Sequence, residues 1–265
     1  MTGEEHHDEY SNELIAFLET VWGEGYLSPG GGEEVDRVLD GLNLAGKLVL
    51  DIGCGAGGVT MRLADVHNAG HVTGIDVEAP VLEVARGRLA SHDEIRDRVE
   101  FLQVEPGPLP FADNSFDMVF SKDALIHIPD KEALFAEIFR VLKPGGMVAA
   151  SDWLRGDDNE PSPEMKEYLT MEGLSFGMAS PTRYRSALEG AGFNDVGLNN
   201  RNGWYLQVAK DELVQLKGKL YAPAVEAAGK EMVDHNIGTW KAMLKVLEIG
   251  ELCPHHFRGQ KPGVA

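Results

Sequence analysis

The sequence predicts an α/β fold, with a doubly wound, mostly parallel sheet of seven strands. Short apolar runs alternate with amphipathic helical patterns from residue 47 to residue 152. A glycine-rich loop follows the first of these runs, and an aspartate ends the second. Right-handed crossovers between parallel strands place helices on both faces of such a sheet.

The composition is that of a globular protein and argues against several classes of function. The chain has 265 residues, 43% of them hydrophobic, and its 24 Lys and Arg against 43 Asp and Glu give a formal net charge of −19. This charge opposes binding to nucleic acids and to anionic membranes. The sequence contains no run of about 18 or more apolar residues, so it predicts no membrane span. The acidic first residues lack a secretory signal, so we expect a cytoplasmic protein.

Metal and disulfide chemistry is not expected. The two cysteines, Cys54 and Cys253, allow neither a disulfide framework nor a four-thiolate zinc site. The adjacent pairs His6–His7 and His255–His256 do not have the spacing that lets two histidines on a helix share a metal.

Residues 1–32 predict an N-terminal helical lid. Leu14, Phe17, Leu18 and Val21 recur at the spacing of an amphipathic helix over residues 11–22. A turn-rich segment follows this helix and ends at residue 32. A second helix is predicted over residues 33–43, at the start of the core.

The α/β core is expected over residues 33–152. Apolar runs that end at turn residues predict strands over 47–51, 71–76, 99–104, 116–121 and 147–151. Amphipathic spacing predicts helices over 58–66, 79–90 and 130–142.

The alternation becomes less regular after the fifth strand. Helices over 164–174 and 181–191 predict a helical substrate lid, residues 153–192, inserted at this point. Residues 193–265 are expected to complete the sheet, with a strand at 193–199, a long helix from about residue 208 and a strand at 250–258. Pro254 predicts an irregular or edge position for this last strand, because proline has no N–H to donate.

The glycine loop DIGCGAGG, residues 51–58, predicts a nucleotide site. Its glycines permit a tight turn and close approach of a ligand to the backbone. Asp76 ends the next strand about 20 residues later, the spacing of a carboxylate that binds ribose hydroxyls. Gly53, Gly55 and Gly58 also fit the GxGxxG pattern of dinucleotide sites. Asp51 argues against NAD, because a carboxylate there repels a pyrophosphate and suits a cation.

Residues 47–152 resemble class I methyltransferases that use S-adenosylmethionine (SAM), through DIGCGAGG, GID, FD and LKPGG taken together. The resemblance implies that Asp76 holds the ribose and that Val77 touches the adenine. Glu105 takes the place of a family aspartate that meets the adenine amino group. The residues expected to bind SAM are Leu27, Ser28, Asp51, Gly53, Cys54, Gly55, Gly57, Asp76, Val77, Glu105 and Ser121.

Candidate catalytic residues lie beyond the fourth strand and near the N-terminus. Methyl transfer from a sulfonium is an in-line displacement, and an amine must lose its proton before it attacks. Asp123 is placed to orient an amine, His127 to accept its proton, and Tyr10 to close over the site.

A closer resemblance, to phosphoethanolamine N-methyltransferases, rests on residues 10–32, including GEGYLSPGG, and on SKDALIHI. It implies that Tyr10 and His127 form a dyad that positions and deprotonates the amine, and that Asp123 orients the substrate. The residues expected to line the substrate pocket are Tyr26, Trp153, Tyr168 and Glu172.

The phosphate-binding residues of that family are not matched. Glu172 and Leu174 stand where an arginine and a tyrosine are expected, Met243 stands in place of a lysine, and Trp153 in place of a tyrosine. A carboxylate beside a phosphate is unfavourable. These departures argue against a phosphorylated substrate.

Residues 183–193 resemble sarcosine/dimethylglycine N-methyltransferases. A substrate with a carboxylate would need a cation, for which Lys122, Arg155 and Arg183 are candidates, whereas Glu172 favours a second positive group. We expect a SAM-dependent N-methyltransferase of a small polar amine, active as a monomer or homodimer. The alternatives are O- or S-methylation of a small carboxylic acid, a SAM-binding module without catalysis, and NAD-dependent oxidoreduction.

Overall fold

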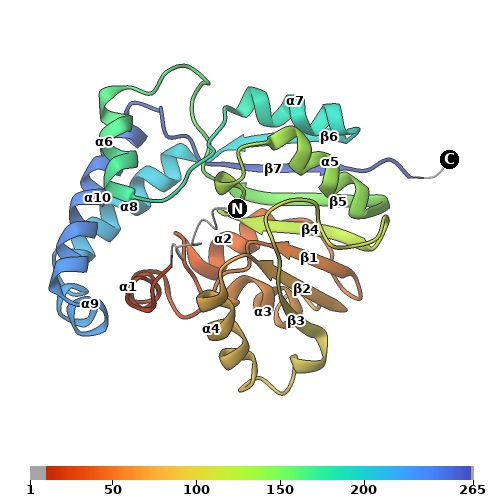
Figure 1. The fold of residues 1–265 in the computed structure, drawn as a ribbon, viewed down its shortest axis with the longest axis horizontal. Coiled ribbons are helices and arrows are strands. Elements are labelled where there is room, and N and C mark those ends of the chain that lie inside the picture. The colour runs from red at the N-terminus through yellow and green to blue at the C-terminus, as the bar shows by residue number, and fades with distance from the viewer. Residues whose placement is uncertain (1–9, 264–265) are drawn as a thin grey trace, which may run out of the picture.

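The structure, a computed structural model, describes residues 10–263, which fold around one seven-stranded sheet (Figure 1). The strand order is β3-β2-β1-β4-β5-β7-β6. Strands β1 to β5 pair in parallel, and β7 runs antiparallel to both of its neighbours. The strands are β1 (Leu48–Ile52), β2 (His71–Asp76), β3 (Val99–Gln103), β4 (Phe116–Lys122), β5 (Leu142–Asp152), β6 (Asn194–Asn200) and β7 (His255–Gln260). The predicted doubly wound, mostly parallel sheet is confirmed.

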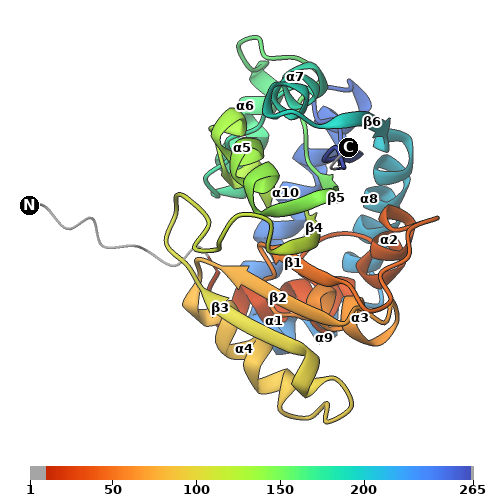
Figure 2. The same ribbon diagram turned by 90° about the vertical axis from the view of Figure 1, so that its right-hand side faces the viewer.

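Helices pack on both faces of the sheet, because successive strand residues point to opposite sides (Figure 2). Val49 of β1 joins one apolar core and Leu50 joins the other. The first core contains α2 (Gly31–Val38), α3 (Gly58–Asp65) and α4 (Ala79–Leu89), and the second contains α5 (Lys131–Val141) and α7 (Pro181–Ala191).

A third apolar core lies beyond the ends of β4 and β5, and we call the helices that form it the helical cap (Figure 1). Phe17, Tyr168 and Trp240 are among its buried residues, and Trp153, which follows β5, joins them. The helices of the cap are α1 (Asn12–Trp22), α6 (Pro163–Glu172), α8 (Asn202–Leu216), α9 (Tyr221–Ala228) and α10 (Lys230–Glu248).

Two expectations for the C-terminal part are wrong. The long helix is three helices, interrupted at residues 217–220 and at Gly229, whose φ of +82° suits a residue without a Cβ. The last strand is not at an edge, since β7 lies between β5 and β6. Pro254 precedes the first paired residue of β7, so the ladder does not need its missing N–H.

Within residues 10–263, no helix combines the length and the apolarity required to cross a bilayer.

Candidate functional site

The glycine loop between β1 and α3 is held against the end of β2. The amides of Gly53 and Cys54 both donate to the carbonyl of Ile75, at 2.9 and 3.0 Å. Gly53 has a φ of +71°, and a Cβ added there would lie 2.1 Å from the Cβ of Ala124. A residue with a side chain therefore cannot occupy position 53 without moving the turn that follows β4.

Asp76 ends β2 and faces this loop. Its Oδ2 accepts from the amide of Gly55 at 2.8 Å, and its Oδ1 accepts from the amide of Glu78 at 3.1 Å. Burial raises the pKa of Asp76 above its usual range, although these two hydrogen bonds act to lower it. The carboxylate is thus fixed in position before any ligand arrives.

A cavity of about 760 Å³, which we call the large cavity, opens at the carboxyl ends of β1, β2, β3 and β4. This is the edge where open α/β sheets bind ligands, and the volume is typical of small-molecule sites. The predicted cofactor residues that line it are Leu27, Ser28, Gly53, Cys54, Gly55, Asp76, Val77 and Glu105.

Three predicted cofactor residues do not line either cavity and lie behind the large one. Asp51 is buried and accepts from the hydroxyl of Thr60 at 2.6 Å. Ser121 donates to the carbonyl of Ile52 at 2.7 Å. Gly57 is packed against Phe101 and leads into α3. These residues shape the loop from behind the cavity, and their contact with a ligand stays a prediction.

Asp51 also departs from the expected charged state. Burial raises its pKa to about 7, and the hydrogen bond from Thr60 offsets this only in part. Its Oδ1 is buried and has no hydrogen-bond partner. A carboxyl in this environment favours the protonated form.

A smaller cavity of about 70 Å³, which we call the inner cavity, lies between the helical cap and the turn after β4. Trp153, Tyr168 and Glu172 line it, as expected for substrate residues. Tyr26 does not, since it lines the large cavity, and it contacts Arg62. Sequence reasoning missed Trp22 and Phe176, which also line the inner cavity and carried no local signal.

The three predicted catalytic residues lie where the two cavities meet. Tyr10, Asp123 and His127 line both of them. Tyr10 precedes α1, whereas the other two follow β4. The structure therefore brings together residues that are more than a hundred positions apart in the chain.

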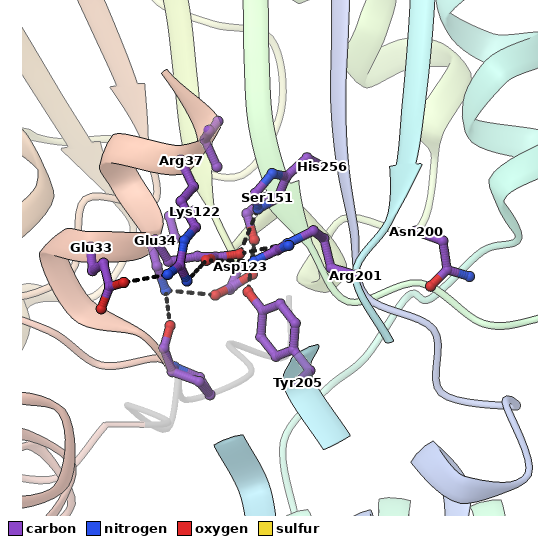
Figure 3. Close-up of polar contacts among 12 residues, drawn as sticks. Glu33, Glu34, Arg37, Lys122, Asp123, Ser151, Asn200, Arg201, Tyr205 and His256 are labelled. Carbon is purple, nitrogen blue, oxygen red and sulfur yellow. Dashed lines mark hydrogen bonds and ion pairs between the residues drawn. The ribbon is translucent and has the colours of Figure 1, made fainter. Parts of the chain in front are cut away.

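Asp123 is held by a buried polar network (Figure 3). Its Oδ2 accepts from Lys122 Nζ at 2.8 Å and its Oδ1 accepts from Ser151 Oγ at 2.7 Å. Because Ser151 gives its only proton to Asp123, the hydroxyl of Tyr205 donates to Ser151 at 3.0 Å. Asp123 has a φ of +57°, a left-handed conformation that needs such support.

A second buried carboxylate ties the core to the helical cap beside this network (Figure 3). Glu34 of α2 accepts from Arg201 Nη2 at 3.1 Å and forms a hydrogen bond with His256 Nε2 at 2.6 Å. Burial alone would raise the pKa of Glu34, but these two partners lower it below its usual range. Together the two networks fix the turn after β4 relative to α2, α8 and β7.

The geometry of His127 defines which ring nitrogen is basic. Its Nδ1 is 2.9 Å from the carbonyl oxygen of Ser175, which can only accept. Nδ1 therefore carries the proton of the neutral ring, and Nε2 is the basic nitrogen. The ring also packs on Phe176, with centroids 5.3 Å apart.

The cations considered for a substrate carboxylate are engaged elsewhere. Lys122 is bonded to Asp123, to Ser28 and to the carbonyl of Pro29. Arg183 pairs with Glu132 at 2.7 Å, and neither Arg183 nor Arg155 lines either cavity. Within the part of the chain that the structure describes, no group of three His, Cys, Asp or Glu side chains could hold a metal ion.

Comparison with known proteins identifies the family of this chain. Residues 43–221 match the family model described as "Methyltransferase domain". Phosphoethanolamine N-methyltransferase 1 of Triticum aestivum is 36% identical over 248 residues, which are 92% of this chain and 47% of the relative. The chain thus spans about half the length of the curated relatives it matches.

Two solved structures share the fold. Phosphoethanolamine N-methyltransferase 2 of Haemonchus contortus, in complex with phosphomonomethylethanolamine and S-adenosylhomocysteine, has a TM-score of 0.87 at 26% identity, covering 96% of this chain and 59% of its own. A putative sarcosine dimethylglycine methyltransferase from Galdieria sulphuraria has a TM-score of 0.80 at 19% identity, covering 96% and 98% of the two chains. With its matched segment, its sheet order and its glycine loop, the chain belongs to the methyltransferase-domain family.

Proposed function

We propose that this chain is a SAM-dependent methyltransferase that acts on the nitrogen of a small amine. The observation that carries this proposal is the position of Tyr10, Asp123 and His127 on the boundary between a nucleoside-sized cavity and a small one. A methyl donor in the first and an acceptor in the second would meet at these three residues. The curated and structural relatives that are N-methyltransferases support this assignment.

The large cavity suits SAM on several counts. Asp76 presents a preoriented carboxylate to ribose hydroxyls, and Glu105 lies on the same wall for the adenine amino group. Gly53 and Gly55 line the cavity without a Cβ and so permit close approach to the backbone. When bound, SAM supplies a methyl group on a positively charged sulfur.

The chain's own residues would prepare the acceptor. Asp123 attracts the protonated amine and holds its nitrogen opposite the methyl group. His127 takes the proton of the amine at Nε2, because Nδ1 already donates to Ser175. The new N–C bond forms as the S–C bond breaks, and the electron pair of that bond stays on sulfur.

Methyl transfer from radiolabelled SAM tests the proposal with amines, hydroxy acids and thioether acids offered side by side. We expect label only in the amines. Label in the acids alone would instead support O- or S-methylation. Calorimetry provides a second test, in which S-adenosylhomocysteine (SAH) binds and NAD does not. Binding of SAH without transfer to any acceptor would favour a non-catalytic module.

A further inference from the structure

The walls of the inner cavity are aromatic and acidic. The aromatic residues that line it are Tyr10, Trp22, Trp153, Tyr168, Phe176 and Trp240. Asp123 and Glu172 also line it, and among residues 10–263 no lysine or arginine does. Lys122, the nearest cation along the chain, lines the large cavity and already compensates Asp123. An anionic group placed here would meet the carboxylate of Glu172 with no lysine or arginine in the lining to compensate it.

Glu172 is a partly buried acid that has no charge partner among residues 10–263. It is the last residue of α6 and lies one turn after Tyr168, so both side chains lie on the same face of the helix. Burial is the one cause that raises its pKa, to about 7, and no hydrogen bond or neighbouring charge offsets it. Buried carboxylates are normally paired. A cation in the inner cavity would supply the missing partner.

Two of the tryptophans that line the inner cavity are fixed by one carboxylate. The indole N–H groups of Trp22 and Trp240 both donate to Glu212, at 2.7 and 3.0 Å. Glu212 does not line the inner cavity, so it holds the two rings from behind. The ring centroids are 5.6 Å apart with a 32° tilt. Tryptophan faces are the best aromatic partners for cations, and a carboxylate at the N–H makes the ring more electron-rich.

We propose that the methyl acceptor is a short diamine with a cationic arm, whose distal ammonium occupies the inner cavity between Glu172 and the tryptophan faces. This inference rests on the proposed function and names its substrate class. The volume of about 70 Å³ accommodates a few non-hydrogen atoms, which matches an aminoalkyl arm and excludes a long chain. The second amine, deprotonated, would then lie at Asp123 and His127.

A set of acceptors that differ only in the arm tests this directly. N,N-dimethylethylenediamine, N,N-dimethylethanolamine, the phosphate ester of the latter and dimethylglycine all carry the same dimethylamino nitrogen, and identification of the quaternary ammonium product shows that this nitrogen has reacted. We expect the highest kcat/KM for the diamine, by about tenfold or more over the alcohol, and the lowest values for the two anions. A higher kcat/KM for the phosphate ester or for dimethylglycine would overturn the proposal.

The Glu172→Gln variant assigns the preference to the carboxylate. It should lower kcat/KM for the diamine about tenfold or more and change that for the alcohol less than about twofold. Glu167→Gln is the matched control, because Glu167 lies on the same helix but pairs with Lys245 at the surface. Equal effects of Glu172→Gln on both acceptors would overturn the assignment. Unchanged SAH affinity in both variants shows that they are folded.

Binding provides a readout that does not depend on turnover. Three of the four tryptophans line the inner cavity, so their fluorescence in the SAH complex reports its occupation. The diamine should change this fluorescence in the wild type and bind about tenfold more weakly to Glu172→Gln. No response to the diamine, together with intact SAH binding, would overturn the substrate class and leave the SAM site standing. Absence of SAH binding would instead overturn the proposed function.

Discussion

Replacing Gly53 with alanine tests whether the glycine loop must press against the turn after β4. The left-handed φ of +71° costs about 1–2 kcal/mol once a Cβ is present. The new Cβ also lies 2.1 Å from that of Ala124, and relieving such an overlap costs roughly 1–3 kcal/mol. We therefore expect Gly53→Ala to lower the free energy of unfolding by about 2–5 kcal/mol. SAH should bind at least about tenfold more weakly, because the loop or the turn must move.

Urea denaturation and SAH calorimetry measure these two effects, and a double-mutant cycle separates their causes. Ala124→Gly removes the Cβ that collides, so the Gly53→Ala/Ala124→Gly protein should recover the steric part and keep only the backbone part. Gly87→Ala in α4 is the control, since nothing lies within 4 Å of its new Cβ, and it should gain up to about 1 kcal/mol. Wild-type stability and SAH affinity in Gly53→Ala, or strictly additive effects in the double variant, would refute the reasoning.

Three further predictions concern charges at the site and in the core. Asp76→Asn should weaken SAH binding about tenfold or more in calorimetry, because the ribose hydroxyls lose a charged acceptor; unchanged affinity would contradict the ribose role. His127→Ala should keep SAH affinity and lower kcat by about a hundredfold or more in the labelled transfer assay, whereas equal losses of both would contradict its role as base. Burial raises the pKa of Asp51, Asp152 and Glu212 to about 7, so the folded chain retains protons that the unfolded chain loses near about pH 4. The free energy of unfolding should accordingly fall as the pH rises from about 5 to about 7.5 in urea titrations, and Asp152→Asn should reduce this slope; a rise over that interval would contradict the assignment.

The parts of the site that follow from local patterns were predictable from the sequence. Strand carboxyl ends meet at one edge of a parallel sheet, so the loop after β1, Asp76 and the turn with Asp123 had to converge. The roles of Tyr10 and His127 were predicted from a family resemblance and not from a local pattern. The sequence could not show which loop residues line the cavity and which, like Asp51, are buried behind it.

The inner cavity depends on contacts that no local pattern encodes. Glu212 accepts from Trp22, 190 residues earlier in the chain, and from Trp240, 28 residues later. A sequence window shows Glu212 only as an acid on a helix. Tertiary packing decided this outcome, and propensity did not. The division of the last helix into three pieces was missed for another reason, since Gly218, Pro223 and Gly229 are local signals of a helix break that the prediction did not use.

In the proposed reaction, positive charge moves from the large cavity towards the inner cavity, and the two cavities are lined by different residues. Positive charge is on the sulfur before transfer and on the nitrogen afterwards, so it moves from the large cavity to the boundary of the inner one. Lys122 already compensates Asp123. In the proposed complex, Glu172 and the rings of Trp22 and Trp240 instead attract the distal ammonium, which is cationic before and after transfer.

Asp123 lies at the boundary where the new charge forms, because the reacting amine is neutral when it attacks and cationic only as the new bond forms. The nucleoside that remains is a neutral thioether, and it loses the attraction of the acidic large cavity. If the aromatic walls and Glu172 served substrate binding alone, Glu172→Gln would raise KM and leave kcat unchanged. Because they face the distal ammonium and not the reacting nitrogen, we expect Glu172→Gln to raise KM for the diamine and to leave its kcat within about twofold.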